Sequence, residues 1–89
     1  MRRIAFEPKA FEQYNEWAVG DKKAFNKLLK LIYETAKTPF TGTGKPEHLR
    51  RNYKGCWSRH IAGEHRLVYK VTDNDIIILS CKFHYDTNK

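Results

Sequence analysis

Residues 45–70, KPEHLRRNYKGCWSRHIAGEHRLVYK, are the stretch around which the rest of this chain is arranged. Two runs with strand character, residues 57–62 and 65–72, are joined at Ala62-Gly63-Glu64, which predicts a β-hairpin. Side chains alternate along the second run, so that Arg66 and Lys70 share the face opposite the apolar one. A cationic hairpin with interleaved aromatic residues suits a polyanion, because arginine forks match phosphate oxygens and flat rings stack on bases.

The formal net charge of the 89-residue chain is +7, and it is unevenly distributed. Residues 37–70 contain eight lysines and arginines against two carboxylates, whereas residues 1–36 carry +2 and residues 71–89 carry −1. The concentration of charge around the predicted hairpin favours an anionic partner such as a nucleic acid. The alternative is a solvated basic surface without a partner.

The segment before this stretch is typical of a scaffold. Residues 2–6 alternate weakly and predict a short strand, and Pro8 suits the first turn of a helix. The apolar stripe of that helix consists of Phe11, Tyr14, Trp17 and Ala18. Gly20 and Asp21 end it and start a second helix, which Thr38-Pro39 terminates. The predicted buried face of the second helix consists of Phe25, Leu28, Leu29, Ile32 and Ala36.

Residues 40–48 contain two glycines and a proline and predict a loop. Its glycines lack the GxxxxGK[ST] spacing of a nucleotide-binding loop. Further strands are predicted at residues 49–53 and, after a turn at 73–75, at 76–85. The order β-α-α-β-β-β-β predicts an α+β fold, with an antiparallel sheet and the two N-terminal helices packed on one face. At this length we expect one domain spanning residues 1–89.

Cys56 and Cys81 are the only cysteines, and neither lies in a metal-binding pattern. We therefore expect no metal site, and nothing in the sequence indicates a cofactor. The sequence also lacks a signal peptide and a spanning apolar run, so we expect a cytoplasmic protein without a membrane partner.

Several polar residues have the chemistry needed to cleave RNA without a metal: Glu47, Arg59, His60, Arg66, His84 and Tyr85. Such a reaction needs a base for the 2′-OH, a cation for the charge on phosphorus and an acid for the leaving oxygen. A hairpin centred on Asn74 places Arg66 near Lys82, two residues from His84. Taken singly, Glu47 could be an ordinary loop glutamate and Arg66 an exposed strand cation. The residues alone therefore support a nucleic-acid-binding domain and leave nuclease activity open.

Four motifs occur in order along the chain: TPFTGTGKPEHL, GCWSRHI, EHRLVYKVTD and a terminal CKFHY. Together they resemble the YoeB toxins of the RelE/ParE superfamily. The resemblance implies the toxin of a bacterial type II toxin–antitoxin pair, a ribosome-dependent mRNA endonuclease acting in the A site. It also implies roles for four residues: Glu47 as general base, Arg66 as transition-state cation, His84 as general acid and Tyr85 in orienting the substrate.

The predicted RNA contacts are Lys45, Arg50, Arg51, Lys54, Arg59 and His60. Arg59 matches the first arginine of the family's usual WSRR, whereas His60 replaces the second. The resemblance further implies three partners: the ribosome, mRNA and a cognate antitoxin. We expect the antitoxin to have an acidic, disordered C-terminal segment. A homodimer remains open.

Two other functions remain compatible with the sequence. A ParE-like gyrase inhibitor would share the fold but would not need Glu47, Arg66 and His84. A non-catalytic RNA-binding module would use the same cations and cut nothing.

Overall fold

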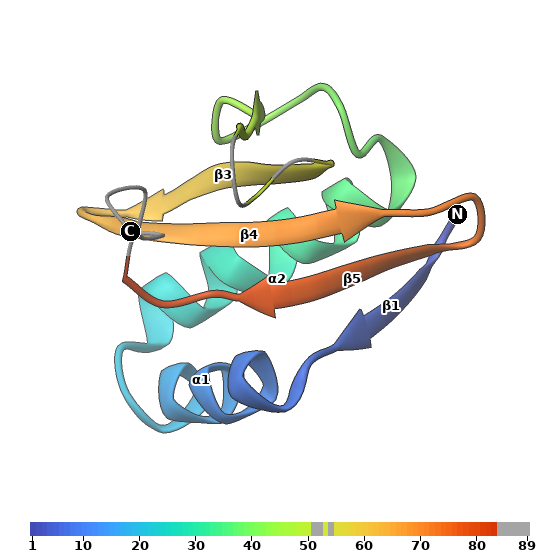
Figure 1. Cartoon of the computed structure of the whole chain (residues 1–89). Coiled ribbons are helices and arrows are strands. Elements are labelled where there is room, and N and C mark those ends of the chain that lie inside the picture. The colour runs from blue at the N-terminus through green and yellow to red at the C-terminus, as the bar shows by residue number, and fades with distance from the viewer. Residues whose placement is uncertain (51–52, 54, 84–89) are drawn as a thin grey trace.

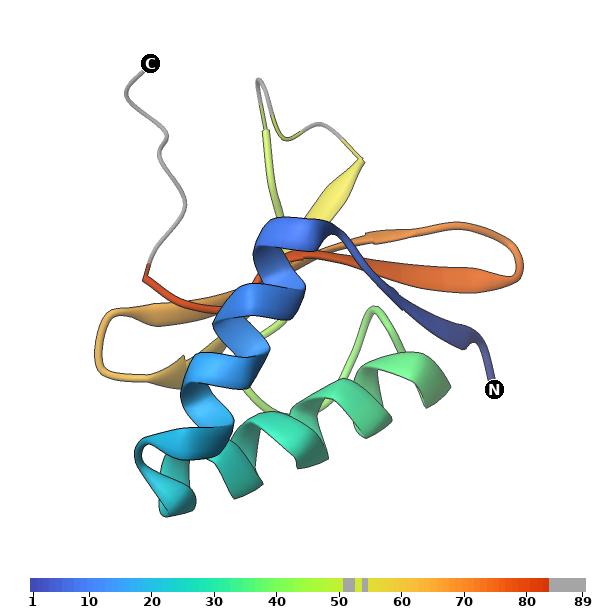
Figure 2. The same ribbon diagram turned by 90° about the horizontal axis from the view of Figure 1, so that it is seen from below.

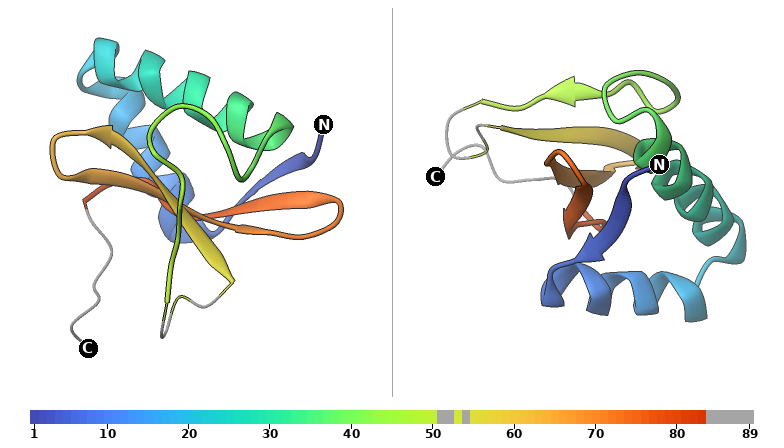
Figure 3. Two further views of the ribbon diagram at one scale, coloured as in Figure 1. Left: turned by 90° about the horizontal axis from the view of Figure 1, so that it is seen from above. Right: turned by 90° about the vertical axis from the view of Figure 1, so that its right-hand side faces the viewer.

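The computed structural model describes residues 1–50, 53 and 55–83, and in this part of the chain a five-stranded sheet has the strand order β1-β5-β4-β3-β2 (Figure 1). The elements are β1 (Arg3–Phe6), α1 (Pro8–Val19), α2 (Lys22–Lys37), β2 (Glu47–His48), β3 (Cys56–Ala62), β4 (His65–Val71) and β5 (Asp75–Ser80). Both helices cover the same face of the sheet (Figures 2 and 3). The predicted α+β fold is confirmed.

Local sequence signals account for the helix ends. Pro8 occupies the first turn of α1, where its missing N–H has no partner to lose. The side chain of Asp21 caps α2 by accepting hydrogen bonds from the backbone N–H groups of Lys23 and Ala24, at 3.0 and 3.2 Å. The last residue of α2 precedes Thr38-Pro39, as predicted. Neither helix in the described part of the chain has the length and apolar composition needed to cross a lipid bilayer.

Side chains from both helices and from the facing strands form the main core: Ala10, Trp17, Ala24, Leu28, Leu31, Ile32, Ile61, Leu67, Tyr69, Ile78 and Cys81. The predicted stripes are partly wrong, because each helix is rotated about its axis relative to the prediction. Leu31 is buried, whereas Leu29 is only half-buried. On α1, Phe11 and Ala18 are exposed. Trp17 lies where it was predicted and donates a hydrogen bond from Nε1 to the Cys81 carbonyl at 2.7 Å.

The sheet is mixed rather than antiparallel throughout, because β1 pairs with β5 in parallel from Arg3↔Asp75 to Phe6↔Ile78. The helices carry the chain across the sheet, so that β2 lies at the edge opposite β1. Three antiparallel pairings then bring the chain back until β5 lies beside β1, running in the same direction.

The predicted strand at residues 49–53 is not found at residues 49, 50 and 53, the described residues of that range. Pairing occurs two residues earlier, at Glu47–His48, within the segment predicted as a loop. Leu49 follows β2 and still donates its N–H to the Cys56 carbonyl of β3 at 2.9 Å. Its side chain is buried with Cys56 and Val68 in a small cluster on the face away from the helices. The Tyr53 N–H donates to the Arg50 carbonyl at 3.2 Å.

A β-bulge in β5 changes which face of the sheet its later side chains lie on. Tyr69 pairs with Ile78 but Val68 pairs with Ser80, so Leu79 is an extra residue opposite β4. Because of this insertion, Ile78 and Cys81 both pack in the main core, whereas regular alternation along the predicted strand would put them on opposite faces. The strand ends at Ser80 rather than Tyr85, and the predicted strand residues beyond Phe83 lie outside the described residues.

Candidate active site

The β3–β4 hairpin brings His60 and Arg66 together as direct cross-strand partners. They alternate with the core residues Ile61 and Leu67, so they lie on the face away from the helices. An Arg66 Nη1–H group donates a hydrogen bond to His60 Nδ1. Because a guanidinium has no acceptor, this hydrogen bond requires an unprotonated Nδ1, as in the neutral ring with its proton on Nε2.

The surroundings of His60 favour this neutral form. Partial burial is the largest cause that lowers the pKa of His60, and the positive charges of Arg66, Lys27 and Lys45 lower it further. These cations come from β4, from α2 and from the loop before β2. Each of these three charges disfavours a further positive charge on the His60 ring.

Glu47 joins the same face through β2. It pairs with Ser58, which precedes His60 by two residues, so the two side chains project on the same side of the sheet. The offset along the strand is about 7 Å, from a rise of roughly 3.3 Å per residue. Lys45 and Glu47 are both exposed. The structure thus collects Glu47, His60 and Arg66 on one accessible face.

Phe83, the residue before His84, is held beside Arg66. The Arg66 N–H donates to the Phe83 carbonyl at 3.0 Å, and the Phe83 N–H donates to His65 Nδ1 at 2.6 Å. The His65 ring also packs edge-on against Trp17, with centroids 5.0 Å apart. Nothing in the local sequence of His65 signals this anchoring role. His84 and Tyr85 lie outside the described residues, so their catalytic roles stay predictions.

Arg59 occupies a different environment from the one predicted for an RNA contact. Its side chain is completely buried, and its guanidinium binds Glu34, Tyr69 and three loop carbonyls on the helix side of the sheet. The reason is strand alternation, since Arg59 lies between Ser58 and His60 and must face the other way. This position corrects the expectation that Arg59 contacts RNA directly. Among the other predicted contacts, Arg50 is exposed, while Arg51 and Lys54 lie outside the described residues.

The cysteines are poorly suited to nucleophilic chemistry. Burial raises the pKa of the Cys81 thiol to about 12, and it also raises the pKa of Cys56. Within residues 1–50, 53 and 55–83, no three histidine, cysteine, aspartate or glutamate side chains gather closely enough to hold a metal ion.

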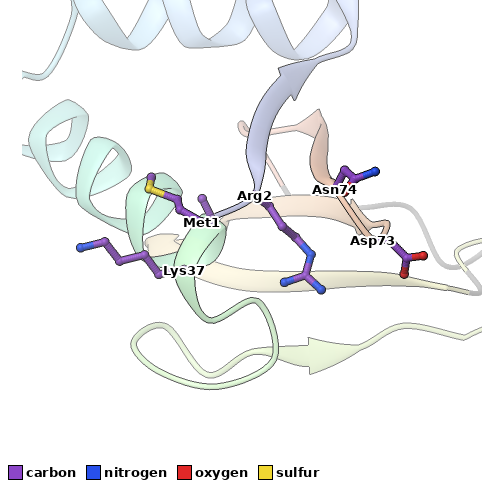
Figure 4. Close-up of a pocket in the computed structure, with 6 residues that line it drawn as sticks. Met1, Arg2, Lys37, Asp73 and Asn74 are labelled. Atoms are coloured by element: carbon purple, nitrogen blue, oxygen red, sulfur yellow. The ribbon is translucent and has the colours of Figure 1, made fainter.

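A separate polar pocket lies at the other end of the sheet, where the N-terminus meets the β4–β5 turn (Figure 4). Its labelled lining residues are Met1, Arg2, Lys37, Asp73 and Asn74. The volume is about 260 Å³, below the roughly 300–1,000 Å³ of typical small-molecule sites. This pocket is therefore a weaker candidate for a functional site than the face that includes Arg66.

Comparison with solved structures shows which class of protein this architecture defines. The YoeB dimer from Staphylococcus aureus contains a chain that matches with a TM-score of 0.86 and 46% identity, covering 94% of this chain and 98% of that one. The heterotetrameric YoeB–YefM toxin–antitoxin complex from the same organism gives a TM-score of 0.85 and 45% identity, covering 96% of this chain and 99% of that one. The two-helix, five-strand architecture is thus that of small bacterial toxins.

The sequence comparisons agree. Toxin YoeB of Escherichia coli is 43% identical over 83 residues, which cover 93% of this chain and 99% of that protein. A family model described as a YoeB-like toxin of bacterial type II toxin–antitoxin systems matches residues 6–85. The chain belongs to this family of type II toxins, and the resemblance seen in the four sequence motifs is confirmed.

Proposed function

We propose that this toxin is a metal-independent endoribonuclease that cleaves mRNA in the A site of the ribosome, in the cytoplasm, and thereby inhibits translation. The observation that carries the proposal is the gathering of Glu47, His60 and Arg66 on one cationic face, with Phe83 bound to the Arg66 backbone. Because His84 follows Phe83 in the chain, this end of the hairpin is where a base, a cation and an acid can act on one phosphodiester.

The proposed reaction uses four residues. Glu47 takes the proton of the ribose 2′-OH, and the 2′ oxygen attacks phosphorus as the bond from phosphorus to the 5′ oxygen breaks. Arg66 stabilises the negative charge that develops on the phosphoryl oxygens. His84 protonates the departing 5′ oxygen, and Tyr85 orients the substrate. The products are a 2′,3′-cyclic phosphate and a 5′-OH end.

The exposed cations are proposed to bind the RNA backbone. Lys45 and Arg50 are accessible beside the site, and His60 contributes by holding Arg66. The predicted contacts by Arg51 and Lys54 remain part of the proposal. Contacts of this kind are electrostatic, so binding should weaken steeply as salt rises.

The test is primer extension on translated mRNA after brief induction of the toxin. Wild type should create new 5′ ends within codons, and His84→Ala or Glu47→Gln should reduce them by roughly 10²–10⁴-fold. Arg3→Gln is the control, because Arg3 is an exposed residue of the β1 edge strand whose partner is Asp75. Intact mRNA together with inhibited DNA supercoiling would instead favour a gyrase inhibitor. RNA binding without cleavage would favour a non-catalytic RNA-binding module.

We also propose that a cognate antitoxin neutralises the toxin by covering this cationic face. The relative from Staphylococcus aureus is described as a heterotetrameric complex with an antitoxin, and another structure from that organism is described as a dimer. An acidic, disordered segment that folds over Lys45 and Arg66 would match the charge there. Hydrogen exchange on the purified complex should then show protection of β4 and of the loop before β2. Protection confined to α1 and α2 would contradict this mode of inhibition.

A further inference from the structure

Arg59 directs all five of its N–H donors into the protein. Nη2 donates to the carbonyls of Thr38 and Thr41 at 2.5 and 2.9 Å, and Nη1 donates to the Thr43 carbonyl at 3.1 Å. The remaining donors reach Glu34 at 3.3 Å and the Tyr69 hydroxyl at 3.2 Å. Three of the five bonds therefore end on the backbone of the loop between α2 and β2.

The partners of Arg59 bind the same loop. Glu34 Oε2 accepts a hydrogen bond from the Thr43 N–H at 2.6 Å, which, with the charge of Arg59, lowers the pKa of that carboxyl. Tyr69 donates from its hydroxyl to the Pro39 carbonyl at 2.6 Å. The loop is thus attached at four of its carbonyls and one N–H to a single cluster, in which Arg59 and Tyr69 are buried and Glu34 is one-third exposed.

The loop fits closely against this cluster and against β3. Gly44 has φ +87°, and a Cβ there would lie 3.0 Å from the His60 carbonyl oxygen and 3.2 Å from Arg59 Cβ. The His60 N–H donates to the Gly44 carbonyl at 2.7 Å. The loop therefore reaches Lys45 and Glu47 with its backbone fixed on both sides.

We propose that Arg59 is a positioning residue, which holds the loop at residues 38–44 and thereby sets where Lys45 and Glu47 stand relative to Arg66. This inference rests on the proposed function, since it assigns Glu47 a place in cleavage. Replacing a whole buried ion pair by well-packed apolar residues is often neutral, so the burial of Arg59 alone does not explain why an arginine stands there. What an apolar residue cannot do is specify the path of a polar loop through three directed hydrogen bonds to its carbonyls.

The first test is Arg59→Met, measured by single-turnover cleavage of mRNA in programmed ribosomes. The matched control is Arg3→Met, which removes the same charge from the exposed β1 edge strand. We expect Arg59→Met to lower the maximal rate by about a hundredfold with the half-saturating toxin concentration nearly unchanged, because a misplacement of about 1 Å can cost that much. Arg3→Met should keep the wild-type rate.

Amide hydrogen exchange separates positioning from general destabilisation. In the wild-type protein the amides of Thr43 and His60 donate to Glu34 and Gly44. In Arg59→Met these two amides should exchange faster. The amides of α2 around Leu28 should keep their wild-type protection. A rate loss with uniform loss of protection would reduce Arg59 to a stabilising residue, and an unchanged rate with a released loop would overturn the proposal outright.

A second variant reaches the loop without altering Arg59, in case Arg59→Met does not fold. Gly44→Ala should displace the loop from β3 and lower the cleavage rate in the same way. Gly55→Ala is its matched control, because Gly55 has a similar φ of +84° but, apart from its chain neighbours, no atom of the described residues lies within 4 Å of an added Cβ. Equal rates for the two alanine variants would contradict the proposal. Failure of the proposed function itself is distinguishable, since the wild-type toxin would then not cleave either.

Discussion

Adjacent leucines on α2 offer a direct test of the packing. Leu28 is completely buried in the main core, whereas Leu29 is half-buried. Both occupy the middle of the same helix, so replacement by alanine changes helix propensity equally at the two positions. The difference in unfolding free energy between Leu28→Ala and Leu29→Ala therefore isolates the effect of burial.

The expected cost of Leu28→Ala is about 2–5 kcal/mol, because its methyl groups are lost from a site enclosed by side chains of both layers. Leu29→Ala should cost about 1 kcal/mol, since part of that side chain already faces water. Urea unfolding followed by circular dichroism gives both values. A thermal scan should separate the two midpoints by several degrees, at roughly 4–8 °C per kcal/mol for a domain of this size. Equal costs would refute the described orientation of α2.

Three further predictions follow from the proposed chemistry. Because the proposed reaction uses no metal, EDTA should leave the rate unchanged on ribosomes supplied with enough Mg²⁺ to stay intact, and a rate that followed the free metal would contradict it. An mRNA with a 2′-deoxy sugar at the cut site should survive, since the attacking oxygen is absent; cleavage of that substrate would exclude 2′-OH attack. Free RNA should be cut far more slowly than mRNA in a programmed ribosome, because the decoding site supplies positioning worth roughly 7–11 kcal/mol, and rates within a few-fold of each other would show a complete active site in the toxin alone.

Local signals in the sequence predicted the scaffold well. Asp21 as a helix cap, Pro39 as a stop signal and the alternation of β4 each depend on a few neighbouring residues, and all three are confirmed. The parallel pairing of β1 with β5 depends on where the helices return the chain, which no local pattern encodes. The bulge at Leu79 was missed because an extra residue in an apolar run leaves the composition unchanged.

The candidate site likewise has features that local sequence signals predicted and features that they did not. Alternation correctly put Arg66 on the face opposite Leu67, and the hairpin centre brought the segment around Lys82 to Arg66, where Phe83 is found. The burial of Arg59 was missed because an arginine in a basic stretch is usually exposed. Its position next to His60 in strand β3 was nevertheless a usable signal, since neighbouring strand residues face opposite sides. Its hydrogen-bond partners were not predictable, because they come from a loop without a periodic pattern.

The hydrogen bond between Arg66 and His60 predicts how the stability of the protein changes at acidic pH. Protonation of Nδ1 would remove the acceptor of the Arg66 hydrogen bond and add a cation beside Arg66, Lys27 and Lys45. The pKa of His60 is lowered in the folded protein. The unfolded chain therefore binds more protons at pH values between the folded and the unfolded pKa. The stabilisation is therefore complete above the unfolded value of about 6.5 and is lost as pH falls through the folded pKa.

His60→Gln keeps a side-chain acceptor but does not titrate, so this variant should lose less stability than wild type between pH 7.5 and pH 5.5. Cleavage should follow the same order, since a protonated His60 no longer orients the guanidinium that stabilises the phosphoryl charge. His48→Gln is the matched control, because His48 is exposed and stacks on Trp57 rather than on a cation. It should retain the acid response of wild type. If His60→Gln and wild type lost stability and activity in parallel, another group would be responsible for the acid limb, and the orientation of Arg66 would not depend on the charge of His60.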